Sequence, residues 1–132
     1  EKGCNIEECD NLDIREFIND MPVCLAAADL VICRAGAMTI SELQAQGKPA
    51  VLIPSPNVAE NHQYHNAMSL VNANAARIIE EKDLTPEKLT ETVDEMVKDP
   101  QRLNEYAENA KKTAILDSNE RILSIIKKFV KL

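Results

Sequence analysis

One strand-to-helix turn, the nonapeptide Arg34-Ala-Gly-Ala-Met-Thr-Ile-Ser-Glu42, constrains the fold of this chain most strongly. An apolar, β-branched run at residues 29–33 precedes the turn and is typical of a buried strand. Apolar residues at helical spacing predict a helix over residues 39–46, and Gly47 supplies its C′ stop. The nonapeptide therefore lies at the carboxyl edge of a sheet, which is where open α/β sheets bind their ligands.

The same turn has a functional and a structural interpretation. Gly36 allows a tight turn or the close approach of a ligand to the backbone. The first helical amides, at Met38 and Thr39, lack intrahelical acceptors and form a potential anion site. Alternatively, Thr39 and Glu42 form a capping box, which is a structural feature only. Arg34 favours the ligand interpretation, because an arginine at the end of an apolar strand suits an anion better than the core.

Length and composition fit one globular domain. The chain has 132 residues, of which 45% are hydrophobic and 28% charged, so an intrinsically disordered protein is excluded. Its apolar runs are too short to cross a bilayer as helices. A net charge of −7 disfavours nucleic acid and anionic membrane surfaces as partners. Because the sequence does not begin with Met, we expect it to be a piece of a longer protein.

Four cysteines lie at positions 4, 9, 24 and 33, without a C-x₂-C pair. Cys24 and Cys33 occur in apolar runs and are predicted to be buried free thiols. For Cys4 and Cys9, a disulfide or metal binding stays open, although reduced thiols in the cytosol are the default expectation.

The remaining pattern predicts a parallel α/β sheet followed by helices. Strands are expected at residues 14–18, 29–33, 50–54 and 76–79. The helix starts are expected at Asp20, residue 39, Asn61 or His62, Thr85, Asp99 and about Ser118. The order β-α-β-α-β-α-β implies right-handed crossovers between parallel strands. Thr85 and Asp99 each precede a proline, which is the arrangement of an N-cap followed by proline at the first helical position.

The loop after the third predicted strand carries a second polar cluster. It leaves the same edge of the sheet, so we expect it beside the Gly36 turn, and it places His62, Gln63, His65 and Asn66 within five residues. Neutral amides and imidazoles suit hydroxyl-rich ligands such as sugars, because both kinds of group donate and accept hydrogen bonds. The alternative is a solvated helix start. No third ligand accompanies His62 and His65, so a metal site is not expected.

Taken together, the two loops resemble one family. The matching motifs include Phe17-Ile-Asn-Asp-Met21, the segment 27–42, Gly47-Lys-Pro-Ala50 and Asn61-His-Gln-x-x-Asn-Ala67. Tail segments at 84–89, 99–103 and 117–121 match as well. Over roughly residues 12–132 the sequence resembles the carboxyl-terminal domain of the MurG glycosyltransferases. Each piece alone is common, but the combination is specific.

The resemblance implies a GT-B fold, in which two Rossmann-like domains hold a sugar nucleotide between them. Residues 1–132 would then form an α/β, Rossmann-like parallel sheet with extra C-terminal helices, as part of the carboxyl-terminal donor domain. The acceptor-binding amino-terminal domain and the first half of the donor domain would lie outside this sequence. A sheet divided in this way has an unpaired edge and exposed apolar surface, so we expect the chain to self-associate.

The functional residues of the family can be carried over position by position. Ile18 would present backbone groups to the uracil edge, and Glu42 would hold the ribose hydroxyls. The backbone amides of Ala37, Met38 and Thr39 would face the diphosphate and the sugar.

Three further positions complete the implied site. Gln63 would hold hydroxyls of N-acetylglucosamine, with His62 beside it. Arg34 matches a family arginine next to the diphosphate region.

The implied reaction is an inverting transfer of N-acetylglucosamine from UDP-N-acetylglucosamine to lipid I, the undecaprenyl-linked muramoyl-pentapeptide of peptidoglycan synthesis. An acceptor hydroxyl would displace UDP in line, while the enzyme positions the groups and neutralises the leaving diphosphate. The resemblance implies neither a cofactor nor an essential metal, and no carboxylate of the chain stands out as the general base. It also implies a peripheral protein at the cytoplasmic face of the bacterial membrane, contacting lipid I through its amino-terminal domain.

Three alternatives stay open at this point. They are a related glycosyltransferase with another acceptor, a non-catalytic UDP-sugar-binding subunit that needs a partner chain, and a sugar-nucleotide epimerase of similar fold. The sequence does not separate acceptors, because the acceptor contacts would lie outside residues 1–132. A second Rossmann-like half upstream would favour the complete transferase, and a start codon there would favour the subunit.

Overall fold

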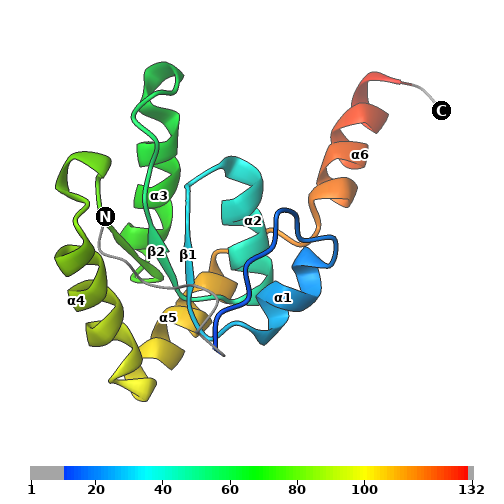
Figure 1. Ribbon diagram of the computed structural model, residues 1–132. Helices are drawn as coiled ribbons and strands as arrows, with labels where there is room; N and C mark the ends of the chain where they lie inside the picture. The colour runs from blue at the N-terminus through cyan, green and yellow to red at the C-terminus, as the bar shows by residue number, and fades with distance from the viewer. Residues whose placement is uncertain (1–10, 131–132) are drawn as a thin grey trace.

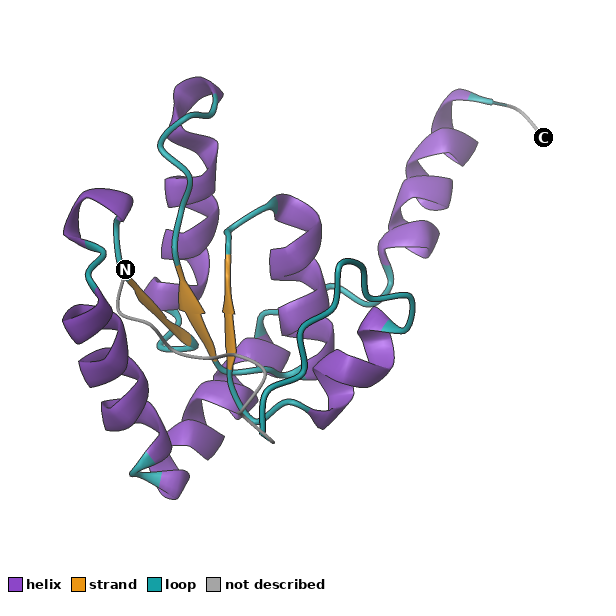
Figure 2. Ribbon diagram, in the orientation of Figure 1, coloured by secondary structure: helices purple, strands orange, loops and turns teal. Residues whose placement is uncertain are grey.

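Three short parallel strands lie at the centre of the protein, surrounded by helices (Figures 1 and 2). The computed structural model describes residues 11–130. The strands pair in the order β1-β2-β3, with β2 in the middle. In chain order the elements are α1 (Met21–Ala27), β1 (Val31–Cys33), α2 (Ala37–Gln46), β2 (Ala50–Leu52), the 3₁₀ turn η2 (Ala59–Asn61), α3 (His62–Asn72), β3 (Ala76–Ile78), the 3₁₀ turn η3 (Glu81–Asp83), α4 (Pro86–Val97), α5 (Pro100–Lys112) and α6 (Ser118–Phe129).

Helices cover both faces of the sheet. Side chains alternate along β2, so its apolar residues point to both faces and each face must be covered. Ala50 and Leu52 belong to the core that the sheet forms with α2 and α3. Val51 points to the opposite face, where it packs in a core with Met96 of α4 and Tyr106 of α5. All three β2 residues are 0% exposed, as expected for the central strand of a parallel sheet covered on both faces. The prediction of an α/β, Rossmann-like parallel sheet with additional C-terminal helices is confirmed.

Local start and stop signals in the sequence place most helix ends correctly. Gly47 ends α2 in the left-handed conformation, with φ of 61°. Thr85 accepts a hydrogen bond from the Lys88 amide at 3.1 Å, and Asp99 accepts one from the Arg102 amide at 3.0 Å. Both caps therefore form as predicted.

The predicted strand at residues 14–18 is wrong. Within residues 11–130, the sheet contains β1, β2 and β3 only. Ile14 and Phe17 are 65% and 74% exposed, so the segment has no buried face that would hold it in a sheet. Arg15 bonds locally instead, to Asp13 at 2.7 Å and to Asp20 at 3.4 Å. Asp20 precedes α1 as predicted, but its side chain makes no capping hydrogen bond.

The last helix, α6, extends away from the sheet and its covering helices (Figure 1). None of its residues is buried. Its exposed apolar side chains are those of Ile122, Leu123, Ile125, Ile126 and Phe129.

We expect this chain to self-associate, because an apolar helix face and a short, open sheet are both left exposed. Light scattering at rising protein concentration checks this expectation. The double replacement of Ile122 and Ile126 by lysine, on one face of α6, should shift the distribution toward monomer, whereas Asn119→Lys on the same helix should not. A monomer at high concentration with a cooperative melt would contradict the prediction.

Candidate functional site

The turn after β1 begins α2 two residues earlier than the sequence pattern predicts. Gly36 is the N-cap, with φ of −65° and ψ of 148°, and the helix starts at Ala37. Thr39 is therefore the third helical residue and cannot be the N-cap, so the capping-box interpretation of Thr39 and Glu42 is wrong. A φ of −65° is open to any residue, so Gly36 is not needed for a tight turn.

The amino end of α2 presents free backbone donors. The first intrahelical bond runs from the Ile40 amide to the Gly36 carbonyl at 3.0 Å. The amides of Ala37, Met38 and Thr39 have no acceptor in the described part of the chain. Met38 is 75% exposed, so these donors lie next to solvent. Together with the positive end of the helix dipole, they form an arrangement suited to an anion.

A cavity of about 420 Å³ lies between α1, β1 and α2, beside this helix end. Three of the residues predicted for the site, Ile18, Thr39 and Glu42, line it. The other lining residues are all apolar: Met21, Cys24, Leu25, Ala28, Leu30, Val31, Ile32 and Cys33. Among residues 11–130, the exposed Glu42 carboxylate makes neither an ion pair nor a hydrogen bond. The cavity thus combines apolar walls with one unpartnered carboxylate, which suits a ring bearing a diol.

Arg34 spans the carboxyl edge of the sheet. Its Nη1 donates to the Ile53 carbonyl at 3.3 Å and also pairs with the Glu81 carboxylate. The hydrogen bond between Arg34 and Glu81 lowers the pKa of Glu81 and raises the pKa of Arg34. Both side chains are partly exposed, so the pair is a surface contact that anion binding could rearrange. A direct contact between Arg34 and a ligand stays a prediction.

Two residues of the polar cluster at the start of α3, Gln63 and Asn66, contact the turn beside Gly36. Gln63 Oε1 accepts from the amides of Ala35 at 3.3 Å and Ser55 at 2.9 Å. Asn66 Nδ2 donates to the Ala35 carbonyl at 3.1 Å. His62 is exposed, and its Nδ1 lies 2.9 Å from the Ala59 carbonyl within its own loop. A contact of either His62 or Gln63 with a sugar stays a prediction.

Two residues outside the predicted set of binding residues make contacts here: Asn66, from the polar cluster, bonds Ala35 in the turn, and Glu81 pairs with the predicted Arg34. Asn66 follows Gln63 by three positions, so helical spacing alone places both on one face of α3. Glu81 lies 47 residues beyond Arg34, and no local pattern connects the two.

Cys24 and Cys33 are free, and each is partly rather than fully buried. Burial raises the pKa of the Cys33 thiol from 9.0 to about 11. Cys4 and Cys9 lie outside the described residues.

The shifted pKa of Cys33 predicts slow alkylation. At pH 8 its thiolate fraction, and hence its rate with iodoacetamide, should be about a hundredfold below that of a thiol with the ordinary pKa, because the thiolate is the nucleophile. Peptide mapping by mass spectrometry, with the urea-unfolded chain as the reference, measures this ratio. Equal rates for folded and unfolded Cys33 would contradict the prediction.

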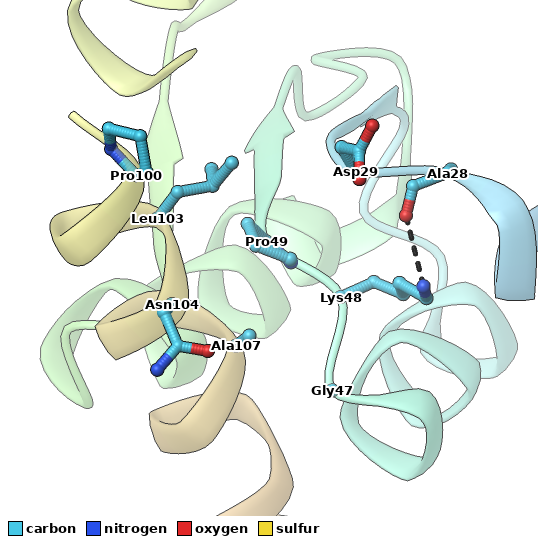
Figure 3. Close-up of a pocket in the computed structure, with 9 residues that line it drawn as sticks. All are labelled: Ala28, Asp29, Gly47, Lys48, Pro49, Pro100, Leu103, Asn104 and Ala107. Carbon is cyan, nitrogen blue, oxygen red and sulfur yellow. Dashed lines mark hydrogen bonds between the residues drawn. The ribbon is translucent and has the colours of Figure 1, made fainter. Parts of the chain in front are cut away.

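A second cavity, of about 270 Å³, lies at the amino edge of the sheet (Figure 3). Lys48 and Asn104 line it, together with residues that precede β1 and β2. Lys48 Nζ donates to the carbonyls of Ala26 at 2.7 Å and Ala28 at 2.9 Å, so it holds the end of α1. No residue predicted for the site lines this cavity.

Residues 11–130 show neither a cluster of metal ligands nor a membrane-spanning helix. They contain no group of three or more His, Cys, Asp or Glu side chains that could hold a metal ion. None of their helices is both long enough and apolar enough to cross a membrane.

Known proteins are similar to this chain over most of its length. Two UDP-N-acetylglucosamine–N-acetylmuramyl-(pentapeptide) pyrophosphoryl-undecaprenol N-acetylglucosamine transferases are similar in sequence. The protein from Acetivibrio thermocellus is 49% identical over 121 residues, which are 92% of this chain and 33% of the relative. The protein from Bacillus cytotoxicus is 44% identical over 122 residues, which are 92% of this chain and 34% of the relative. The chain thus spans about a third of the length of these curated relatives.

A solved structure agrees as well. The crystal structure of Acinetobacter baumannii MurG superposes with a TM-score of 0.79 at 36% identity, covering 85% of this chain and 32% of that one. The resemblance to the MurG glycosyltransferases and the placement in a GT-B fold are confirmed at the level of family and fold. Residues 1–122 match the glycosyltransferase family 28 C-terminal domain. From its sequence and its fold alike, this chain belongs to glycosyltransferase family 28.

Proposed function

We propose that residues 1–132 form part of the donor-sugar site of an inverting N-acetylglucosaminyltransferase. The donor would be UDP-N-acetylglucosamine and the acceptor lipid I, in agreement with the names of the similar transferases. The rest of the enzyme, including an amino-terminal acceptor domain, would lie upstream of this sequence. The whole protein would then be peripheral at the cytoplasmic face of the membrane, where it would meet its lipid-linked acceptor.

One observation carries this proposal. The unpartnered Glu42 shares a largely apolar cavity with Ile18 and Thr39, next to three free amides at the start of α2. In the proposed complex the uracil and ribose occupy the cavity, with Glu42 accepting from the ribose hydroxyls. The diphosphate lies at the helix end, which the amides and the helix dipole favour. The sugar then extends toward Gln63 on α3.

The proposed chemistry follows from this placement. The acceptor hydroxyl attacks the anomeric carbon, the bond from that carbon to the β-phosphate oxygen breaks, and UDP leaves with the bonding electron pair. Negative charge grows on the diphosphate as the bond breaks, so fixed amides directed at it stabilise the transition state more than the ground state. The hydroxyl proton passes to a base outside the described site.

A transfer assay with the full-length protein tests the proposal. UDP release is measured with UDP-N-acetylglucosamine and lipid I, and the glycosylated lipid is identified by mass spectrometry. UDP-glucose and an acceptor-free reaction serve as controls. Donor binding without transfer would contradict the enzymatic role and indicate a binding subunit, whereas transfer only to another acceptor would indicate a related glycosyltransferase.

A further inference from the structure

The side chain of Arg34 crosses the carboxyl edge of the sheet, away from the cavity proposed for the nucleotide. Arg34 follows β1, but its Nη1 donates to the Ile53 carbonyl just after β2 and to the Glu81 carboxylate on η3, which follows β3. The strands pair in the order β1-β2-β3, and the cavity lies on the β1 side of this edge. The pair with Glu81 therefore holds the guanidinium on the β3 side.

These contacts use only part of the guanidinium. Its Nη1 makes both bonds, and within residues 11–130 neither Nε nor Nη2 of Arg34 has a partner. The side chains of Arg34 and Glu81 are 51% and 41% exposed, so water competes with their pairing. The hydrogen bond lowers the pKa of Glu81, so this carboxylate is charged at neutral pH and balances the charge of the arginine. Arg34 is thus a cation whose present partner is exchangeable.

From this arrangement we propose that Glu81 occupies Arg34 in place of the nucleotide diphosphate, and that the two anions exchange when the nucleotide binds. Arg34 lies two positions before the N-cap Gly36, so its backbone is already beside the free amides of α2. A rearranged side chain can reach a diphosphate at that helix end. The inference rests on the proposed function, because it takes the diphosphate to lie at the start of α2. Glu81 itself acts through Arg34 and does not touch the ligand.

The exchange favours the diphosphate because the two anions differ in charge and in geometry. A diphosphate carries more charge than a carboxylate, and the planar fork of a guanidinium can donate to a phosphate through two parallel hydrogen bonds. An exposed pair of Arg34 and Glu81 contributes little by comparison. Breaking this pair nevertheless costs the same for every phosphate-bearing ligand. Uridine has no phosphate to offer Arg34, so its affinity should not depend on Glu81.

Three other roles of Glu81 predict different results. If Glu81 holds Arg34 in the position that binds the ligand, its loss weakens UDP binding. If Glu81 only repels the anionic ligand, the loss of a neighbouring carboxylate strengthens UDP binding to the same extent. If Glu81 only holds η3 in place, its loss lowers the melting temperature, and the folded protein binds UDP normally.

The test uses Glu81→Gln in the full-length protein, because glutamine keeps the size of the side chain and removes its charge. Glu80→Gln is the matched control, since it makes the same change of charge one position away, on a residue that pairs with Lys82 at 3.2 Å. Arg34→Gln, alone and combined with Glu81→Gln, shows whether the effect passes through the guanidinium. The dissociation constants for UDP, UDP-N-acetylglucosamine and uridine are measured by calorimetry at one ionic strength, well below the melting temperatures.

We expect Glu81→Gln to strengthen the binding of UDP and UDP-N-acetylglucosamine about two- to fivefold and to leave uridine binding unchanged. Glu80→Gln should change none of the three affinities. In the Arg34→Gln protein, the addition of Glu81→Gln should have no effect on UDP binding. If Arg34→Gln alone binds too weakly for calorimetry, the comparison of Glu81→Gln with Glu80→Gln decides.

Weaker or unchanged UDP binding by Glu81→Gln would overturn the inference. An equal gain in Glu80→Gln, in uridine binding or in the Arg34→Gln protein would overturn it as well. Each of these outcomes leaves the proposed function intact. Failure of the unchanged protein to bind UDP would overturn the proposed function, and the exchange of anions at Arg34 with it.

Discussion

Replacing Glu42 by glutamine should weaken UDP binding about tenfold or more in the full-length protein. A carboxylate that accepts from the two hydroxyls of a ribose makes charge-assisted hydrogen bonds, worth on the order of 1.5–3 kcal/mol. Glutamine keeps the size of the side chain but not its charge, and it can face the diol with only one acceptor. Because Glu42 has no partner among residues 11–130, the substitution should leave the melting temperature unchanged.

Calorimetric titration of UDP into both proteins measures the effect. Glu105→Gln is the control, because it makes the same change of charge on the exposed surface of α5, away from the cavity. With the capping box excluded by the N-cap at Gly36, the remaining structural interpretation is a solvated glutamate. An affinity equal to that of the unchanged protein would support that interpretation and remove Glu42 from the site.

Gly36→Ala should weaken UDP binding by at least tenfold without loss of stability. The backbone at Gly36 is in a conformation that alanine adopts freely, and an added Cβ meets only Thr39 Oγ1, at 3.8 Å. The change in the free energy of unfolding should therefore stay within about 0.5 kcal/mol. A methyl group at the N-cap nevertheless takes up space where a ligand would approach the first amides of α2. Displacement of the diphosphate costs at least one charge-assisted hydrogen bond, which gives the expected loss.

Gly47→Ala should lower stability and leave UDP binding unchanged, which is the reverse of the effect expected for Gly36→Ala. It therefore serves as the control for that variant. Gly47 has a φ of +61°, and an added Cβ would collide with the aliphatic part of Lys111. We expect a decrease of about 1–2 kcal/mol in the free energy of unfolding, with unchanged UDP affinity of the folded protein. Denaturant titrations and calorimetry on both variants check the pair. Normal UDP binding by Gly36→Ala would show that no ligand approaches this N-cap closely.

Local signals in the sequence were enough to predict most of the fold. Gly47, Thr85 and Asp99 act on backbone groups within three or four residues, so their roles can be inferred from a single stretch of sequence. β1 and β2 are apolar runs between such signals, whereas β3 has Arg77 between Ala76 and Ile78. The failed strand at residues 14–18 has the right residue types but lacks a pairing partner in the described part of the chain, and pairing is not a local property.

The site could be predicted in its location but not in its internal contacts. The Gly36 turn and the His62 loop both follow parallel strands, so the topology alone places them at the same carboxyl edge of the sheet. The bond from Ala35 to Gln63, however, joins residues 28 positions apart, and the pair of Arg34 and Glu81 joins residues 47 apart. Nothing in the local sequence indicates that the side-chain oxygen of Gln63 would accept hydrogen bonds from two backbone amides. These contacts depend on the packing of α3 and η3 around the sheet.

Hydrogen–deuterium exchange of the full-length protein, with and without UDP, tests the central claim most directly. If the cavity beside α2 is the nucleotide site, UDP should slow exchange in the segments 18–25 and 35–43, which include Ile18, the free helix amides and Glu42. Exchange around Lys48 and Asn104, at the opposite edge of the sheet, should stay the same. Protection at Lys48 and Asn104 without protection at 35–43 would contradict the account, as would UDP binding that leaves both regions unchanged.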